Sequence, residues 1–117
     1  MNKPRSNKNK GKLGQNEIVE KILTLFPELE SDDLRSTPMG MPGEDLLPSA
    51  KCRKLLPWCQ EVKRKKKKFV GYTFMEQAKA HGKYEPVVHI RCDGEKDWLS
   101  IVRTDYLLNL LRSLNGN

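Results

Sequence analysis

The sequence lacks the features of a membrane protein and of a disulfide-rich secreted protein. No apolar run approaches the roughly 18 residues that a membrane-spanning helix needs. The lysine-rich start is followed by no apolar segment and no small-residue cleavage site, so we expect no signal peptide. Only three cysteines occur in 117 residues, and none has the C-x₂-C spacing of a structural zinc site. We therefore expect a cytoplasmic protein with free thiols.

Aromatic residues are also few, with two Trp, three Tyr and three Phe. Trp58 and Trp98 both precede apolar residues of predicted strands, so we expect them in the core or at its rim. A base-stacking role for either tryptophan is the alternative.

Positive charge is plentiful and unevenly distributed. The chain has 22 Lys and Arg against 15 Asp and Glu, a formal net charge of +7. Half of the basic residues lie in two stretches without an acid, residues 3–12 and Lys63-Arg-Lys-Lys-Lys-Lys68. Such concentrated charge is typical of proteins that bind a polyanion such as nucleic acid. A solubilising tail and a solvated turn are the alternative interpretation.

Apolar periodicity and turn residues predict a single α/β domain. We expect residues 1–12 to be a disordered basic arm, because they contain almost nothing apolar, and residues 13–117 to form the domain. Helical spacing of apolar residues predicts helices near 15–26, 50–56, 72–81 and 104–114. Short apolar or alternating segments predict strands at 33–36, 44–48, 58–63, 87–90 and 98–102. This order predicts a mixed central sheet flanked by helices.

Four local sequence signals mark where these elements begin or end. Pro27 should end the first helix, and Ser49 should cap the second. The pair Asp93-Gly94 predicts the turn between the last two strands, and Gly116 lies just past the last helix.

The strongest candidate for a chemical site combines Asp45 with the triplet Glu61-Val62-Lys63. On a strand, Glu61 and Lys63 point to the same face, and Asp45 meets Glu61 if the two strands pair side by side. Two carboxylates and a backbone carbonyl form a hard oxygen site suited to Mg²⁺. A lysine beside that metal can orient an attacking water and neutralise charge on a phosphate. The expected chemistry is metal-assisted hydrolysis of a phosphodiester.

Several segments carry a more specific signal than the triplet, which occurs no more often than chance predicts. These segments are Gly14-Gln-Asn-Glu17, Asp32-Asp-Leu-Arg-Ser-Thr37, Gly43-Glu-Asp-Leu-Leu-Pro-Ser49, Glu61-Val-Lys63 and Met75-Glu-Gln-Ala78. In this order and spacing, over about residues 12–112, the chain resembles small, largely phage-encoded nucleases of the PD-(D/E)XK superfamily, related to Holliday-junction resolvases. The resemblance implies a restriction-endonuclease-like core, with a mixed central sheet between helices.

The resemblance also implies roles for individual residues. Asp45 and Glu61 match the two metal-binding acids, and Val62 would contribute its backbone carbonyl to the same metal. Lys63 matches the catalytic lysine. Glu17 matches an acid on the first helix that supports the site.

Other matches and departures concern the surroundings of the site. Gln77 matches a glutamine near the scissile phosphate, and Arg35 lies in a matching segment that we assign to DNA contact. Arg64 replaces the asparagine usual after the catalytic lysine, and we expect Arg64 with Lys65, Lys66, Lys67 and Lys68 to bind the DNA backbone. Glu44 stands where the superfamily motif has proline. We expect it to point away from Asp45, as adjacent residues of a strand do; a third acid of the site is the alternative.

Together, the residues and the resemblance predict a DNA endonuclease that uses Mg²⁺, or Mn²⁺ in its place. The expected substrate is branched or otherwise structured DNA. Because resolving a junction needs two symmetric cuts, a homodimer is expected, located in the host cytoplasm if a phage encodes the protein. Three alternatives remain open: a monomeric enzyme that nicks other DNA structures, a non-catalytic nucleic-acid-binding module on the same fold, and an inhibitor that binds a host protein.

Overall fold

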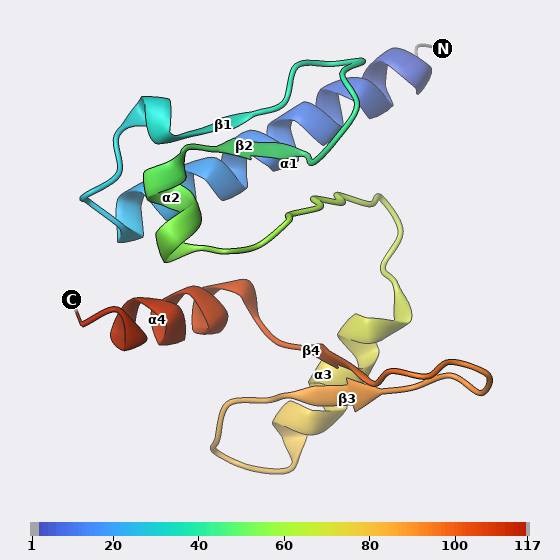
Figure 1. Cartoon of the computed structure of the whole chain (residues 1–117). Coiled ribbons are helices and arrows are strands. Elements are labelled where there is room, and N and C mark those ends of the chain that lie inside the picture. Colours follow the sequence, from blue (N-terminus) through green and yellow to red (C-terminus); the bar gives the residue numbers. More distant parts are fainter. Residues whose placement is uncertain (1–2, 117) are drawn as a thin grey trace. The chain divides into compact units, whose positions relative to one another are not determined.

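The computed structural model describes residues 3–116, with side chains from residue 11 onward, as two compact units (Figure 1). The first unit comprises the chain up to Arg64 together with the residues from Leu111, and the second comprises Lys65–Leu110. The mixed α/β composition predicted from the sequence is confirmed. The described chain nevertheless forms two units where the sequence predicted one domain. None of its helices is both long and apolar enough to cross a membrane.

Helix α1 (Lys3–Leu25) is the longest element of the first unit. It begins at Lys3, whereas the sequence predicted a disordered arm over residues 1–12, of which the first two lie outside the described residues. Lysine favours helices, and the early Pro4 lies in the first turn, where proline is tolerated. The helix ends before Pro27, as predicted, and the Phe26 N–H still donates to the Ile22 carbonyl at 2.9 Å.

Two short strands and a second helix complete the framework of the first unit. The 3₁₀ turn η1 (Ser31–Asp33) leads into β1 (Leu34–Ser36), which pairs antiparallel with β2 (Leu46–Pro48). Both strands confirm predictions made from the sequence, and β1 packs against α1. Helix α2 (Ala50–Leu55) follows.

The start of α2 depends on Ser49. Its side chain accepts a hydrogen bond from the Cys52 N–H at 3.1 Å, so the predicted N-cap is confirmed. The Ser49 hydroxyl also donates to Asp33 at 2.7 Å, and this bond ties the cap to η1. The first unit's core lies between these elements, and its fully buried side chains are Ile22, Phe26, Leu34, Leu46, Cys52 and Leu56.

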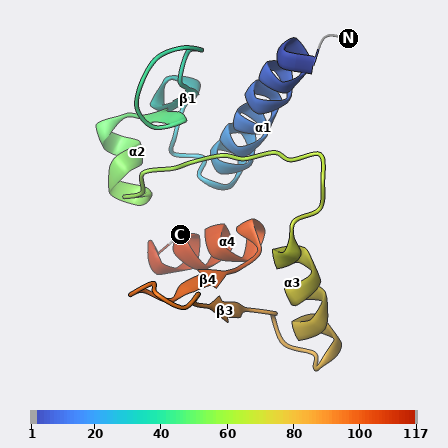
Figure 2. The same cartoon turned by 90° about the vertical axis from the view of Figure 1, so that its right-hand side faces the viewer.

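The second unit contains α3 (Val70–Ala80), β3 (Val88–Ile90), β4 (Leu99–Ile101) and most of α4 (Thr104–Leu114) (Figure 2). Strands β3 and β4 form an antiparallel hairpin, and β3 contacts α3. Gly94 has a φ of +91°, a left-handed conformation that glycine adopts readily, so the predicted turn is confirmed. Gly116, with a φ of +77°, lies past the end of α4 as predicted.

The predicted central sheet is wrong for the described chain, which has two separate two-stranded sheets. The predicted strand at residues 58–63 is also absent, because residues 56–69 form an irregular connection between α2 and α3 (Figures 1 and 2). The physical reason lies at Asp45, whose carboxylate accepts the Val62 N–H that a backbone carbonyl of a neighbouring strand would otherwise accept.

Candidate functional site

Asp45 lies at the point where the chain enters β2. Its carbonyl accepts the Thr37 N–H at 2.9 Å and so extends the β1–β2 ladder by one pair. Its own N–H donates to the Gln60 carbonyl at 3.2 Å. Its carboxylate oxygen Oδ2 accepts the Val62 N–H at 2.7 Å. Asp45 is therefore bonded both to β1 and to the segment that carries Glu61.

The hydrogen bonds that join Asp45 to Gln60 and Val62 place it opposite Glu61. In a parallel ladder a residue bonds to the two neighbours of the residue opposite it, and Asp45 bonds in this way to Gln60 and Val62. One of the two bonds uses the carboxylate, because the Asp45 carbonyl is already bonded to Thr37. The expected meeting of Asp45 with the Glu61 segment is thus present without a regular strand.

Glu61 and Lys63 form an exposed ion pair on this segment. Their Oε2 and Nζ atoms lie 3.1 Å apart, and the two side chains are 61% and 72% exposed. Alternate residues of an extended chain point to the same side, which explains why these two meet. An ion pair so open to water contributes little to stability, so either side chain can turn toward a ligand at small cost.

The other side of the segment packs against α1. A Cβ added to the buried Gly14 would lie 3.3 Å from the Arg64 Cβ and 3.6 Å from the Val62 Cγ1. The glycine therefore allows the backbone of residues 62–64 to approach the helix closely. Glu17 is exposed three residues further along α1, and this spacing puts it on the side of the helix that carries Gly14.

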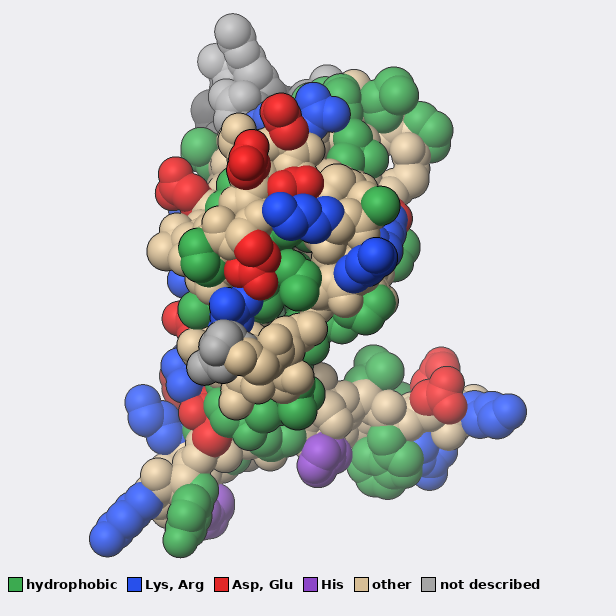
Figure 3. Space-filling view, turned by 60° about the vertical axis from the view of Figure 1, so that its left-hand side comes forward, with side chains coloured by type: hydrophobic (Ala, Val, Ile, Leu, Met, Phe, Trp, Pro, Cys, Tyr) green, Lys and Arg blue, Asp and Glu red, His purple; other side chains and the backbone are tan. Residues whose placement is uncertain are grey.

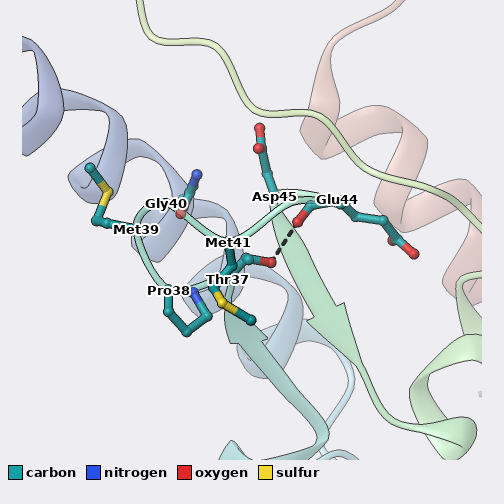
Figure 4. A pocket seen from close by; sticks show the side chains of 9 residues that line it. Thr37, Pro38, Met39, Gly40, Met41, Glu44 and Asp45 are labelled. Carbon is teal, nitrogen blue, oxygen red and sulfur yellow. Dashed lines mark hydrogen bonds between the residues drawn. The ribbon is translucent and has the colours of Figure 1, made fainter.

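An open pocket of about 140 Å³ adjoins Asp45 (Figure 4). Its lining residues come from α1 and from the loop between β1 and β2: Gln15, Thr37, Pro38, Met39, Gly40, Met41, Gly43, Glu44 and Asp45. The Thr37 hydroxyl donates to the Glu44 carbonyl at 2.5 Å and closes this loop across its base. The Oε1 atom of Gln15 is buried and, among the described residues, has no hydrogen-bond partner.

Gln15 is a pocket residue that reasoning from the sequence missed. The only signal was its place beside Gly14 and Glu17 in one of the motif segments, and no periodicity assigns it a polar role. Its unpaired acceptor adds a hydrogen-bonding group to the wall of the pocket that Asp45 shares.

Glu44 does not join Asp45 in the site. Figure 4 shows the two side chains pointing in different directions, as predicted for adjacent residues of an extended chain. The Glu44 carboxylate instead binds Arg53, with Oε2 and Nη2 2.8 Å apart. The hydrogen bond from Arg53 lowers the pKa of the Glu44 carboxyl below its ordinary value of 4.5.

The donor atoms near Asp45 fit a hard cation that keeps much of its water. The residues described in the structure hold no group of three or more His, Cys, Asp or Glu side chains that could bind a metal. Two carboxylates, those of Asp45 and Glu61, come from facing segments, and Oδ1 of Asp45 has no bond to the described residues. Mg²⁺ is commonly bound by one or two carboxylates and several waters, so the donor set suits this ion.

The remaining predicted site residues lie on exposed surfaces. Arg35 is exposed on β1 in the first unit. Gln77 is exposed on α3, and the lysine run precedes the same helix, so both belong to the second unit. Within the run, Lys68 pairs with Glu76 at 2.9 Å. The structure therefore brings together Asp45, Glu61, Val62 and Lys63, while Gln77 belongs to the other unit.

No protein-family model matches the chain, and no curated protein or solved structure is significantly similar to it. A functional assignment therefore depends on the motifs and on the geometry around Asp45.

Proposed function

We propose that this protein is a Mg²⁺-dependent DNA endonuclease of the PD-(D/E)XK type that cuts branched DNA as a homodimer. The observation that carries this proposal is a pair of hydrogen bonds at Asp45: its N–H donates to the Gln60 carbonyl at 3.2 Å, and its carboxylate accepts the Val62 N–H at 2.7 Å. These bonds bring the first acid of the motif beside the Glu61-x-Lys63 triplet. The positions of Asp45, Glu61 and Lys63 in the sequence do not by themselves require these residues to lie side by side.

Each residue of the group has a definite task in this proposal. Asp45 and Glu61, with the carbonyl of Val62, would hold Mg²⁺ or Mn²⁺. When bound, such an ion polarises a phosphoryl oxygen and lowers the pKa of water. The Val62 N–H fixes the orientation of the Asp45 carboxylate. Lys63 releases Glu61 and places its ammonium group against charge that develops on the scissile phosphate.

The wider fold is proposed on the same basis. The β1–β2 pair, extended at Asp45 by residues 60–62, would correspond to the part of a restriction-endonuclease-like sheet that carries the catalytic acids. The helix α1, with Glu17 exposed one turn beyond Gly14, would support this edge.

The basic residues after the triplet would bind the DNA backbone. Lys65, Lys66, Lys67 and Lys68 are all exposed, whereas the base of the Arg64 side chain lies against α1. Each phosphate neutralised by such a contact adds about −0.9 to the slope of log K against log salt. Neutralising the four lysines should therefore weaken binding to all DNA and flatten its salt dependence.

The test is cleavage of a labelled four-way junction and of a matched linear duplex in Mg²⁺, Mn²⁺ or EDTA. We expect metal-dependent cutting that favours the junction. Glu61→Gln and Asp45→Asn should each reduce the rate by about a hundredfold or more, because even residues that only support metal ligands are worth 10- to 100-fold. Glu44→Gln is the matched control, since this neighbouring acid binds Arg53, and it should leave the rate nearly unchanged.

One observation favours a second candidate, a non-catalytic nucleic-acid-binding module. Glu61 is paired with Lys63, and the four lysines that follow, Lys65–Lys68, are all exposed. Such a module would bind DNA in EDTA, lose affinity when Lys65–Lys68 are neutralised, and be indifferent to Glu61→Gln. Tight binding with no cleavage in either metal would overturn the nuclease proposal and favour the module.

A further inference from the structure

The β3–β4 hairpin presents one face that is partly covered and one that is fully exposed. Residue pairs alternate between the two faces of a strand pair. Val88, Ile90 and Ile101 are half-buried, on the hairpin whose β3 contacts α3. His89 and Ser100 face each other on the opposite side, where both are exposed and His89 Nδ1 lies 2.8 Å from Ser100 Oγ.

Arg91 and Trp98 continue this exposed face by one pair toward the turn. The guanidinium carbon of Arg91 lies 5.7 Å from the centroid of the Trp98 ring, which is the geometry of a cation–π contact. The Trp98 residue is nevertheless 65% exposed. The sequence predicted this tryptophan in the core or at its rim, and the structure shows that prediction to be wrong.

The charge of Arg91 is not neutralised by the contacts that hold it. Its Nη1 donates to the backbone carbonyl of Glu95 at 2.8 Å, and no carboxylate bonds to it among the described residues. This bond fixes the guanidinium beside the indole ring. The result is a large aromatic surface that is pre-oriented by a cation and open to water.

We propose that this platform, formed by His89, Arg91, Trp98 and Ser100, stacks on unpaired bases of single-stranded DNA. Exposed aromatic rings beside cations are the usual means of binding single strands, because every base offers a π-face. The inference rests on the proposed function only in taking DNA as the partner. It adds a substrate preference, since an opened arm of a branched DNA supplies unpaired bases and an intact duplex does not.

The surroundings of the platform favour nucleic acid as the occupant. The unit that contains it has nine basic and six acidic residues, and Lys65–Lys68 belong to the same unit. Hydrophobic, basic, acidic and histidine side chains are interspersed on the arm at the lower right of Figure 3. The turn itself carries Asp93, Glu95 and Asp97, so phosphates should avoid the tip while bases reach the ring.

A protein partner makes a different prediction at the neighbouring position. Leu99 is 66% exposed, as open as Trp98, but it points to the other face of the hairpin. A hydrophobic protein surface would gain from either side chain, whereas a base gains from the aromatic ring alone. Leu99→Ala is therefore the matched control.

The experiment follows the fluorescence of Trp98 in a Trp58→Phe background, with oligo(dT) as a single strand and with a duplex of equal length. EDTA is present throughout, so that cleavage plays no part. We expect the single strand to quench Trp98 on binding. Because Trp98→Ala lacks this fluorophore, its affinity is measured by competition with the fluorescent protein for oligo(dT). The affinity for the single strand should fall about tenfold, within the range of a base–aromatic stack.

The other variants and the duplex decide between interpretations. Trp98→Phe should restore most of the affinity, and Leu99→Ala should leave it unchanged. Duplex affinity should not differ between wild type and Trp98→Ala. Absence of quenching, an equal loss on the duplex, or an equal loss in Leu99→Ala would overturn the inference. Stacking that depends on Trp98 without metal-dependent cleavage would uphold it while overturning the nuclease.

Discussion

The two units of the chain differ in how many apolar side chains they bury completely. Of the buried apolar side chains that the structure describes, seven belong to the first unit and only Leu108 to the second. Phe26 has no exposed surface at all. In the second unit Tyr84 is 91% exposed and Trp98 is 65% exposed. The first unit thus has a closed core, and the second exposes four of its six aromatic residues, Phe69, Tyr72, Tyr84 and Trp98.

This difference separates stability from recognition. A closed core holds β1, β2 and the Asp45 contacts in a fixed arrangement, which a hydrolytic site requires. A small unit built on a two-stranded hairpin buries little apolar surface when it folds, and it is marginally stable alone. Its exposed rings are instead available to a ligand.

The largest effect is expected from opening the core of the first unit. Phe26→Ala should lower the free energy of unfolding by about 3–5 kcal/mol, because it removes a fully buried ring and leaves a cavity. Denaturant unfolding followed by Trp58, in a Trp98→Phe background, measures it in the first unit. Tyr84→Ala, in the second unit, is the control and should change stability by no more than about 0.5 kcal/mol. Equal losses in both variants would contradict the difference between the units.

A smaller effect is expected from two glycines of α1 that differ only in their surroundings. An alanine Cβ at Gly11 would meet nothing within 4 Å, whereas at Gly14 it would lie 3.3 Å from the Arg64 Cβ. Gly11→Ala should therefore stabilise the protein by up to about 1 kcal/mol, the helix-propensity gain. Gly14→Ala should gain less, because residues 62–64 must shift. Thermal unfolding of both variants measures the difference.

The same pair of variants tests where α1 begins. If residues 1–12 form a disordered arm, as their composition suggested, Gly11→Ala leaves the melting temperature unchanged. A helix that includes Gly11 predicts an increase. A gain at Gly14 equal to that at Gly11 would show that Val62 and Arg64 do not pack against the helix.

The elements that could be predicted from the sequence are those defined by local signals. Pro27, Ser49 and the Asp93-Gly94 pair act on their own backbone, and each marks the boundary expected of it. The strand predicted at residues 58–63 is absent, because alternation of apolar and polar residues indicates only that a chain is extended. It does not show whether a backbone carbonyl or the side chain of Asp45 will take the hydrogen bond of Val62.

The candidate site was predictable only in part, for a similar reason. Spacing put Glu61 and Lys63 on one side, and the structure pairs them. The closeness of Asp45 to that segment depends on a long-range contact, so the sequence predicts it only on the condition that the two strands pair. The unpaired acceptor of Gln15 and the exposure of Trp98 had no local signal, because each depends on what the rest of the fold leaves uncovered.

The smallest effect is expected from acid, and it should fall on the first unit. The Asp33 carboxylate accepts the Glu30 N–H at 2.8 Å and the Ser49 hydroxyl at 2.7 Å. These two bonds, the first being the larger cause, hold the pKa of Asp33 below its ordinary value of 3.8. Since the folded pKa is the lower one, the stabilisation is complete above pH 3.8 and is lost as the pH falls through the folded value.

Unfolding of wild type and Asp33→Asn, compared at neutral pH and in acid, isolates this contribution. The amide has no charge to lose, so the variant should be less stable than wild type at neutral pH and should converge with it below the folded pKa. Trp58 should report this convergence, whereas Trp98 should not, because Asp33 and Ser49 belong to the first unit. A constant difference between the two proteins at every pH would mean that Asp33 acts through packing and not through its charge. Convergence seen equally by both tryptophans would mean that the two units unfold as one.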